Sequence, residues 1–234
     1  MSIMTSFHVN IIGNRPSATR PGNAPASPRV ESSRFFMKFM NGAWQINGMP
    51  PGMNLPPSTF CLFYEGNEDK PSPSPSIPPS SALPSIHVLE FYNVSMRSLS
   101  DIPNLDTYAG SQTLSKLSFF GCDSLVIDDL SWFASLPVLD DLNLVDCKIT
   151  SLAGLERFPK PISLSIADSS LDLATQIGTI EAYWHKHGGK MRKAGDISIG
   201  GCTIGGRKVQ KTSTMQTATA VGYIRGRMAM YGLS

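Results

Sequence analysis

The chain has 234 residues, a formal net charge of +2 and only four cysteines. This length can bury a hydrophobic core without crosslinks, and no stretch approaches the roughly 20 consecutive apolar residues of a membrane-spanning helix. The cysteines, at 61, 122, 147 and 202, form no Cys-X-X-Cys pair, which argues against a zinc module and against a secreted disulfide scaffold. We therefore expect an intracellular protein in a reducing compartment, cytoplasmic or organellar.

Residues 1–34 are predicted to be a flexible N-terminal segment. Arg15, Arg20 and Arg29 precede the first acidic residue, Glu31. This bias is compatible with an organelle transit peptide, for example mitochondrial, or with the Ser/Pro-rich leader of a secreted bacterial effector. A disordered tail that carries no targeting signal is the plainer interpretation.

Two further segments precede the regular part of the chain. Residues 35–70 are rich in aromatic residues and Met but interrupted by Pro and Gly, which favours a small N-terminal lobe or cap. Residues 71–85, PSPSPSIPPSSALPS, are predicted to be a linker or surface loop, because Pro/Ser segments tend toward extended conformations and pack no core.

A repeated pattern begins after residue 85: apolar, two residues, apolar, one residue, apolar, two residues, then Cys or another small residue. Three clear copies are Leu114, Leu117, Phe119 and Cys122; Leu139, Leu142, Leu144 and Cys147; and Ala194, Ile197, Ile199 and Cys202. Weaker copies are Ile86, Leu89, Phe91 and Val94; Pro161, Leu164, Ile166 and Ser169; and, before the linker, Thr59, Leu62, Tyr64 and Asn67. From Leu89 onward the second apolar positions are 28, 25, 22 and 33 residues apart.

The segment LDDLNLVDCKITSLAGLERFPK resembles the leucine-rich-repeat family, in its short class of about 22 residues per repeat, and the resemblance covers residues 86–205. It implies an α/β fold, a leucine-rich-repeat solenoid whose short parallel strands line a concave face. It also implies that the shared Cys position is a buried structural one beside the backbone of the turn. After each strand, apolar residues predict a short helical or irregular return segment: Ile127, Leu130, Phe133 and Leu136, then Ile149, Leu152, Leu155 and Phe158.

Alternation along such strands places the residues between the core positions on one exposed face. Charged and aromatic side chains on this face, and at its rim, are the predicted partner-binding residues: Glu90, Tyr92, Lys116, Phe120, Asp141, Asn143, Asp146 and Asp168. Exposed aromatic residues beside charges are typical of protein-binding anchors.

The C-terminal region has a different charge. From His87 to Trp184 there are 13 acidic and 5 basic residues, whereas His185 to Ser234 holds 9 basic residues and a single acid. Residues 206–234 are predicted to be a basic C-terminal cap or tail. A possible basic contact surface, with Tyr223 and Tyr231 interleaved, consists of Arg207, Lys208, Lys211, Arg225 and Arg227. The segment AVGYIRGRMAMYG fits equally a short amphipathic helix that covers the last repeat.

Several motifs of chemical interest have simpler explanations. The glycines of GGCTIGGRK lack the Lys-Ser/Thr pair of a phosphate loop and are expected to form turns. His185 and His187 lack a third metal ligand, so EAYWHKHGGK is expected to be a solvated helix end. No catalytic triad or carboxylate pair stands out, and we expect a protein that is not an enzyme and that has no metal or cofactor.

The sequence therefore predicts a non-catalytic protein-protein interaction module, acting as a subunit or scaffold of a larger assembly. One alternative is a secreted bacterial effector whose repeats bind a host protein. Another is a nucleic-acid-associated (ribonucleoprotein) subunit that uses the basic C-terminal region.

Overall fold

The computed structural model describes residues 36–40, 43–47, 55, 57–65, 77–187, 196–210 and 214–233, with only the backbone of 36–40, 43–47 and 65. The predicted segment 1–34, Asn67 and Lys211 lie outside this part of the chain. The strands are β1 Phe36–Met40, β2 Ala43–Asn47, β3 Cys61–Glu65, β4 Val88–Tyr92, β5 Lys116–Phe120, β6 Val126–Ile127, β7 Asp141–Val145, β8 Lys148–Ile149, β9 Ser163–Ser165, β10 Asp196–Ser198, β11 Thr203–Ile204, β12 Arg207–Lys208 and β13 Met215–Gln216. The α-helices are α1 Leu173–His187 and α2 Thr217–Met230, and the 3-10 helices are η1 Ser80–Ala82, η2 Leu99–Asp101, η3 Leu105–Tyr108, η4 Phe133–Ser135 and η5 Leu155–Arg157.

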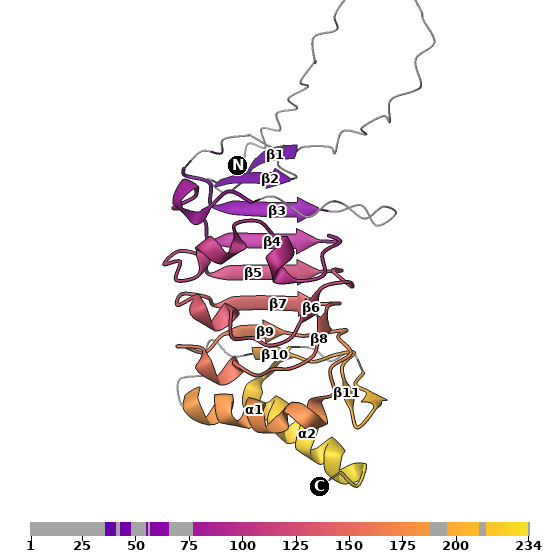
Figure 1. Cartoon of the computed structure of the whole chain (residues 1–234). Coiled ribbons are helices and arrows are strands. Elements are labelled where there is room, and N and C mark those ends of the chain that lie inside the picture. The colour runs from indigo at the N-terminus through magenta and orange to yellow at the C-terminus, as the bar shows by residue number, and fades with distance from the viewer. Residues whose placement is uncertain are drawn as a thin grey trace, which may run out of the picture.

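The fold is mixed α/β, with a mostly parallel sheet and few helices. Among the described residues nine strands form one sheet, in the order β1-β2-β3-β4-β5-β7-β9-β10-β13. Neighbours from β2 to β10 are parallel, whereas the edge strands β1 and β13 are antiparallel to theirs. Figure 1 shows these strands stacked along the molecule, with α1 and α2 at the C-terminal end.

The strand register aligns the second apolar position of each repeat. Leu89 pairs with Leu117, Leu117 with Leu142, Leu142 with Leu164, and Leu164 with Ile197. The weaker candidate repeat before the linker joins the same row, because Leu62 pairs with Leu89. Repeats of unequal length therefore keep their strands in register, and the difference in length is taken up between the strands.

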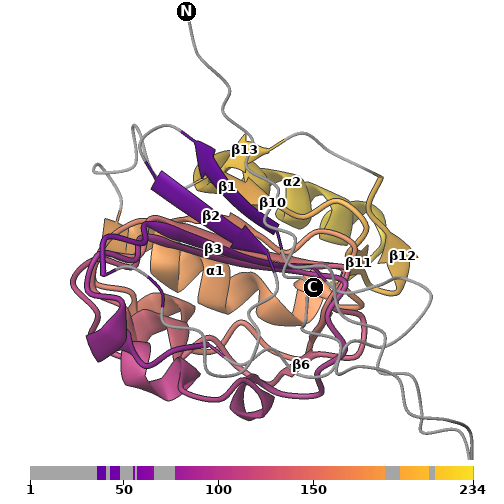
Figure 2. The same ribbon diagram turned by 90° about the horizontal axis from the view of Figure 1, so that it is seen from above.

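The return segments cover the inward face of the sheet. As predicted, η4 and η5 lie in them, and all eight apolar residues expected there are buried. After β9 the longer helix α1 lies on the same side of the sheet, as Figure 2 shows, and it contacts η5. Stacked rings extend the core across neighbouring strands: the ring centroid of Tyr64 in β3 lies 5.3 Å from that of Phe91 in β4, which lies 4.9 Å from that of Phe119 in β5.

The described residues before residue 86 join the sheet and its core. Strand β3, within the predicted N-terminal lobe or cap of residues 35–70, pairs directly with β4 and continues the sheet. Within the predicted linker, Ile77 and Leu83 are buried in the core, although residues 66–76 lie outside the described part. Asn104 donates a hydrogen bond to the Ile77 carbonyl and the Tyr108 hydroxyl donates one to Pro78, so these contacts hold the second half of a Pro/Ser segment on the protein.

Helix α2 occupies the segment predicted to be a cap or tail. It lies against α1 at the end of the stack, and its Ala220, Val221, Ile224 and Met228 are buried. Of the helices that the structure describes, none has the length and apolar character needed to cross a membrane.

Candidate binding surfaces

The cysteines of the repeated position are buried, as predicted. The thiol of Cys147 lies 3.8 Å from the Phe119 carbonyl of the preceding strand, and Cys122 lies at the same distance from Phe91. Cys202 donates to Ile166 at 3.1 Å. Burial raises the pKa of each of these thiols, and it raises the pKa of Cys61 to about 12. Reactive cysteines require a stabilised thiolate, so this environment favours a structural role.

Asp146 and Asp168, predicted at the rim of the outward face, lie in the turns that follow β7 and β9. Asp146 has a φ of 58° and Asp168 a φ of 57°, and both side chains are exposed. Their amides continue the ladder, because Asp146 donates to the Ala167 carbonyl and Asp168 to the Gly200 carbonyl. Asp tolerates this left-handed conformation better than most residues, so the turn itself explains their presence.

A polar row crosses the outward face of β4, β5 and β7. The Lys116 ammonium lies 2.9 Å from a Glu90 oxygen and 3.8 Å from an Asp141 oxygen. Asn143 donates one hydrogen bond to Asp141 and another to the Ser118 hydroxyl. Lys116 and Asp141 each keep about a third of their side-chain surface exposed, 36% and 35%, and remain accessible to a partner.

Glu90 is the buried charged residue of this row. It was predicted to be an exposed contact residue, yet only 4% of its surface is accessible. Lys116 lies against it and the Tyr92 hydroxyl donates a hydrogen bond to its other oxygen, at 2.8 Å. Partial burial by itself would lower the pKa of Lys116. The hydrogen bond to Glu90 and the negative charges of Glu90 and Asp141 have the larger combined effect, so the pKa of Lys116 is raised. Glu90 therefore orients its neighbours and contributes little contact area.

Two half-buried aromatic rings adjoin the polar row. Tyr92 at the end of β4 stacks on Phe120 at the end of β5, with ring centroids 5.0 Å apart. Phe63 of β3 lies 6.5 Å from Tyr92 and extends the group toward the N-terminal strands. The predicted aromatic patch is therefore one contiguous cluster next to the ion pairs.

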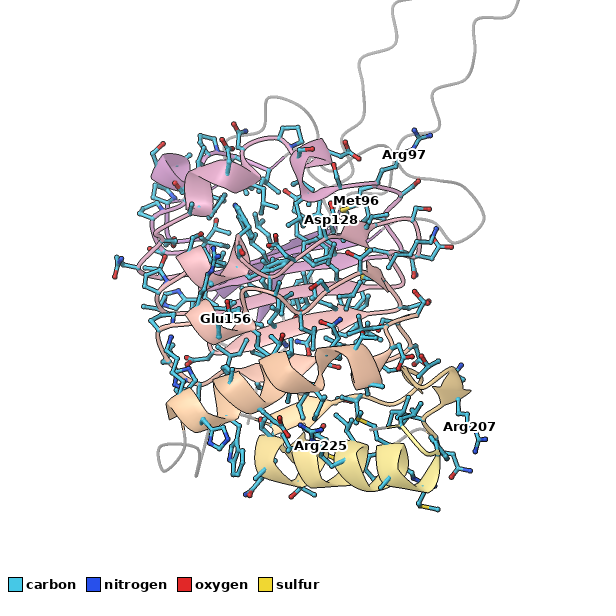
Figure 3. All side chains as sticks on the ribbon, turned by 60° about the horizontal axis from the view of Figure 1, so that its bottom comes forward. Met96, Arg97, Asp128, Glu156, Arg207 and Arg225 are labelled. Atoms are coloured by element: carbon cyan, nitrogen blue, oxygen red, sulfur yellow. The ribbon has the colours of Figure 1, made fainter. Side chains whose placement is uncertain are left out.

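The predicted basic contact surface divides into two environments. Arg225 of α2, labelled in Figure 3, donates two hydrogen bonds of 2.7 Å to Glu181 of α1, so its charge is paired at the surface where the two helices meet. Arg207, Lys208 and Arg227 instead line a pocket between the β11-β12 hairpin and α2, and Lys211 lies outside the described residues. Nothing in the sequence predicts that Arg225 pairs with Glu181, 44 residues away. The four-residue spacing of Tyr223, Arg227 and Tyr231 does predict that these side chains lie on one side of a helix.

The end of α1 is more buried than the predicted solvated helix end. His187 is only 4% exposed and lies edge-on to Tyr183. Lys186 donates hydrogen bonds to the Glu156 and Phe158 carbonyls, which fixes α1 on the preceding return segment. The described residues contain no group of three His, Cys, Asp or Glu side chains placed to hold a metal ion.

The sequence matches no protein-family model and no curated protein.

Proposed function

We propose that residues 86–205 form an irregular leucine-rich-repeat solenoid that acts as a non-catalytic protein-protein interaction module, a subunit or scaffold in a larger assembly. The repeated apolar pattern supports this fold, since its equivalent leucines are neighbours in a parallel sheet. The return segments bury their apolar residues against one face, and on the opposite face Lys116 and Asp141 keep about a third of their side-chain surface exposed.

The observation that carries the proposal is the aromatic cluster beside the polar row on the outward face. Tyr92 and Phe120 are stacked and half-buried before any partner arrives, so binding would restrict their rotation little. Aromatic anchors of this kind, surrounded by polar groups, dominate the energetics of many protein interfaces.

The polar row suggests the chemistry of the partner. Lys116 lies between Glu90 and Asp141, and Asn143 links Asp141 to Ser118, so the donors and acceptors are held in fixed positions. A protein surface with apolar side chains opposite Tyr92 and polar groups opposite Asp141 would complement this arrangement. The same surface would serve either an assembly subunit or a secreted effector, which differ in where the protein acts.

The nucleic-acid alternative has weaker support. Arg225 is neutralised by Glu181, so the basic residues of the C-terminal region do not form one continuous track for a phosphate backbone.

Affinity purification of the tagged full chain from its native cells, followed by mass spectrometry, tests the proposed function. We expect a stoichiometric protein partner whose recovery falls at least about tenfold in the double variant Tyr92→Ala with Phe120→Ala, because loss of aromatic anchors commonly costs 2 kcal/mol or more. Val126→Ala is the matched control, since Val126 is an exposed apolar residue, 37% accessible, in β6 of the separate β6-β8 ladder. Undiminished recovery with the double variant, or no stoichiometric partner at all, would contradict the proposal.

A further inference from the structure

A small pocket of about 120 Å³ lies at the C-terminal end of the molecule, away from the outward face of the sheet. The β11-β12 hairpin forms one wall and the second half of α2 forms the other. Its polar lining consists of Arg207, Lys208, Gln210, Tyr223, Arg227 and Tyr231.

Local sequence explains both walls. Gly205 and Gly206, with φ of 57° and 75°, make the tight turn that reverses the chain and places Arg207 and Lys208 opposite α2. Tyr223 and Arg227 share one face of α2, and Tyr231, directly after the end of the helix, continues the four-residue interval. Two segments with no sequence similarity to each other thus contribute basic groups to one place.

Aromatic rings hold both arginines. The Arg207 guanidinium carbon lies 4.3 Å from the centre of the Tyr231 ring, and that of Arg227 lies 5.3 Å from the centre of the Tyr223 ring. A hydrogen bond to Tyr223 also raises the pKa of Arg227. Stacking uses the flat face of a guanidinium and leaves in-plane N–H groups available as donors.

The charge of the pocket is not neutralised by the part of the chain that the structure describes. No ion pair there involves Arg207, Lys208 or Arg227, in contrast to Arg225, whose carboxylate partner is Glu181. Three positive charges in so small a space repel one another. A bound anion would relieve that repulsion.

We propose that this pocket binds the phosphate group of a small phosphate monoester or of inorganic phosphate. The pocket volume of about 120 Å³ is well below the ~300–1,000 Å³ of pockets that enclose a whole drug-sized ligand. The site therefore fits one tetrahedral anion, with the rest of an ester left outside. The oxygens of a phosphate match the planar donor fork of Arg and the point charge of Lys, and its charge of about −1.5 to −2 at neutral pH suits three cations.

The test is an NMR titration of the isotopically labelled full chain. Sodium phosphate, phenyl phosphate or a single-stranded DNA oligonucleotide is added, and the backbone amide resonances are followed. Sodium chloride keeps the ionic strength constant. We expect saturable shifts at Gly205, Gly206 and Val209 with sodium phosphate, and with phenyl phosphate if an ester is the natural ligand. Arg207→Gln and Arg227→Gln should each weaken binding about tenfold or more, because each removes a charge-assisted hydrogen bond.

Arg97→Gln is the matched control, because Arg97 is an exposed arginine far from the pocket (Figure 3). Its phosphate affinity should equal that of the wild type, and the amide spectrum of each variant shows that it is folded. The proposal is overturned if sodium phosphate produces no saturable shift, if Arg97→Gln weakens binding as much as Arg207→Gln, or if the oligonucleotide alone binds. Because this pocket is separate from Tyr92 and Phe120, its test and that of the proposed function can fail independently.

Discussion

At the scale of single residues, the thiols of Cys122 and Cys147 lie beneath carbonyl groups of the preceding strands, at 3.8 Å in both cases. Such contacts are weak hydrogen bonds, so the main contribution of these side chains is the space that they fill between adjacent turns. The same position holds Ser169 in another repeat, where its hydroxyl lies 3.4 Å from the Cys202 sulfur. A small side chain with weak or moderate polarity is therefore what the turn requires.

Cys147→Ser is expected to lower the free energy of unfolding by about 1–2 kcal/mol, because the site is buried and the hydroxyl costs more to desolvate than the thiol. Chemical denaturation monitored by circular dichroism measures the change. Partner binding should be unaffected in the folded variant. Loss of binding without loss of structure would show that Cys147 has a functional role.

At the scale of elements, β4, β5, β7, β9 and β10 each lead into a left-handed turn. The residues with positive φ at these equivalent positions are Asn93, Gly121, Asp146, Asp168 and Gly201. Only Gly, Asn and Asp occur there, since other side chains meet the following carbonyl in this conformation. These turns allow repeats of different length to begin their return segments from one edge of the sheet.

Gly201→Ala should destabilise the protein by at least about 1–2 kcal/mol. Its φ is 84°, and an added Cβ would lie 2.8 Å from Asp168 Cα and 2.9 Å from Asp168 N, which are backbone atoms that cannot easily move. Thermal unfolding followed by calorimetry measures the effect.

Gly178→Ala is the matched control for this substitution. Gly178 lies within α1, with nothing within 4 Å of an added Cβ. Ala should stabilise the helix there by up to about 1 kcal/mol. Equal effects of the two substitutions would contradict the turn geometry.

At the scale of the whole molecule, the buried thiols and three of the buried tyrosines share one property. Burial raises the pKa of all four cysteines and of Tyr64, Tyr108 and Tyr183 above ordinary values of 9.0 and 10.0. Below about pH 9 these groups are protonated in both the folded and the unfolded chain. Above that pH the unfolded chain releases their protons first, so unfolding becomes more favourable.

We therefore expect the free energy of unfolding to be insensitive to these groups near neutral pH and to fall as the pH rises above about 9. Each group contributes at most about 1.4 kcal/mol per pH unit. Denaturation curves between pH 7 and 11 measure the slope, and Cys147→Ser should make it shallower because one buried thiol is removed. A free energy of unfolding that stays constant or rises up to pH 11 would contradict this account.

Much of the sheet is predictable because its information is local. The apolar spacing of Leu139, Leu142 and Leu144 recurs along the chain, and neighbouring copies pair in that register. The buried setting of Cys147 follows from the same alignment. Ile77 and Leu83 were missed because their Pro/Ser surroundings gave no periodic signal. Hydrogen bonds from Asn104 and Tyr108, and between Ser80 and Thr107, hold their segment on the protein.

The candidate surfaces depended more on tertiary structure. The sequence alone indicated that Tyr92 and Phe120 share a face, because alternation along a strand sets side-chain direction. It contained nothing to show that Glu90 is buried under Lys116 and Tyr92, that Arg225 pairs with Glu181, or that Arg207 and Arg227 meet in one pocket. Periodicity along the chain determines which way a side chain points, whereas burial and charge pairing depend on contacts between segments far apart in the sequence, and only the folded chain decides them.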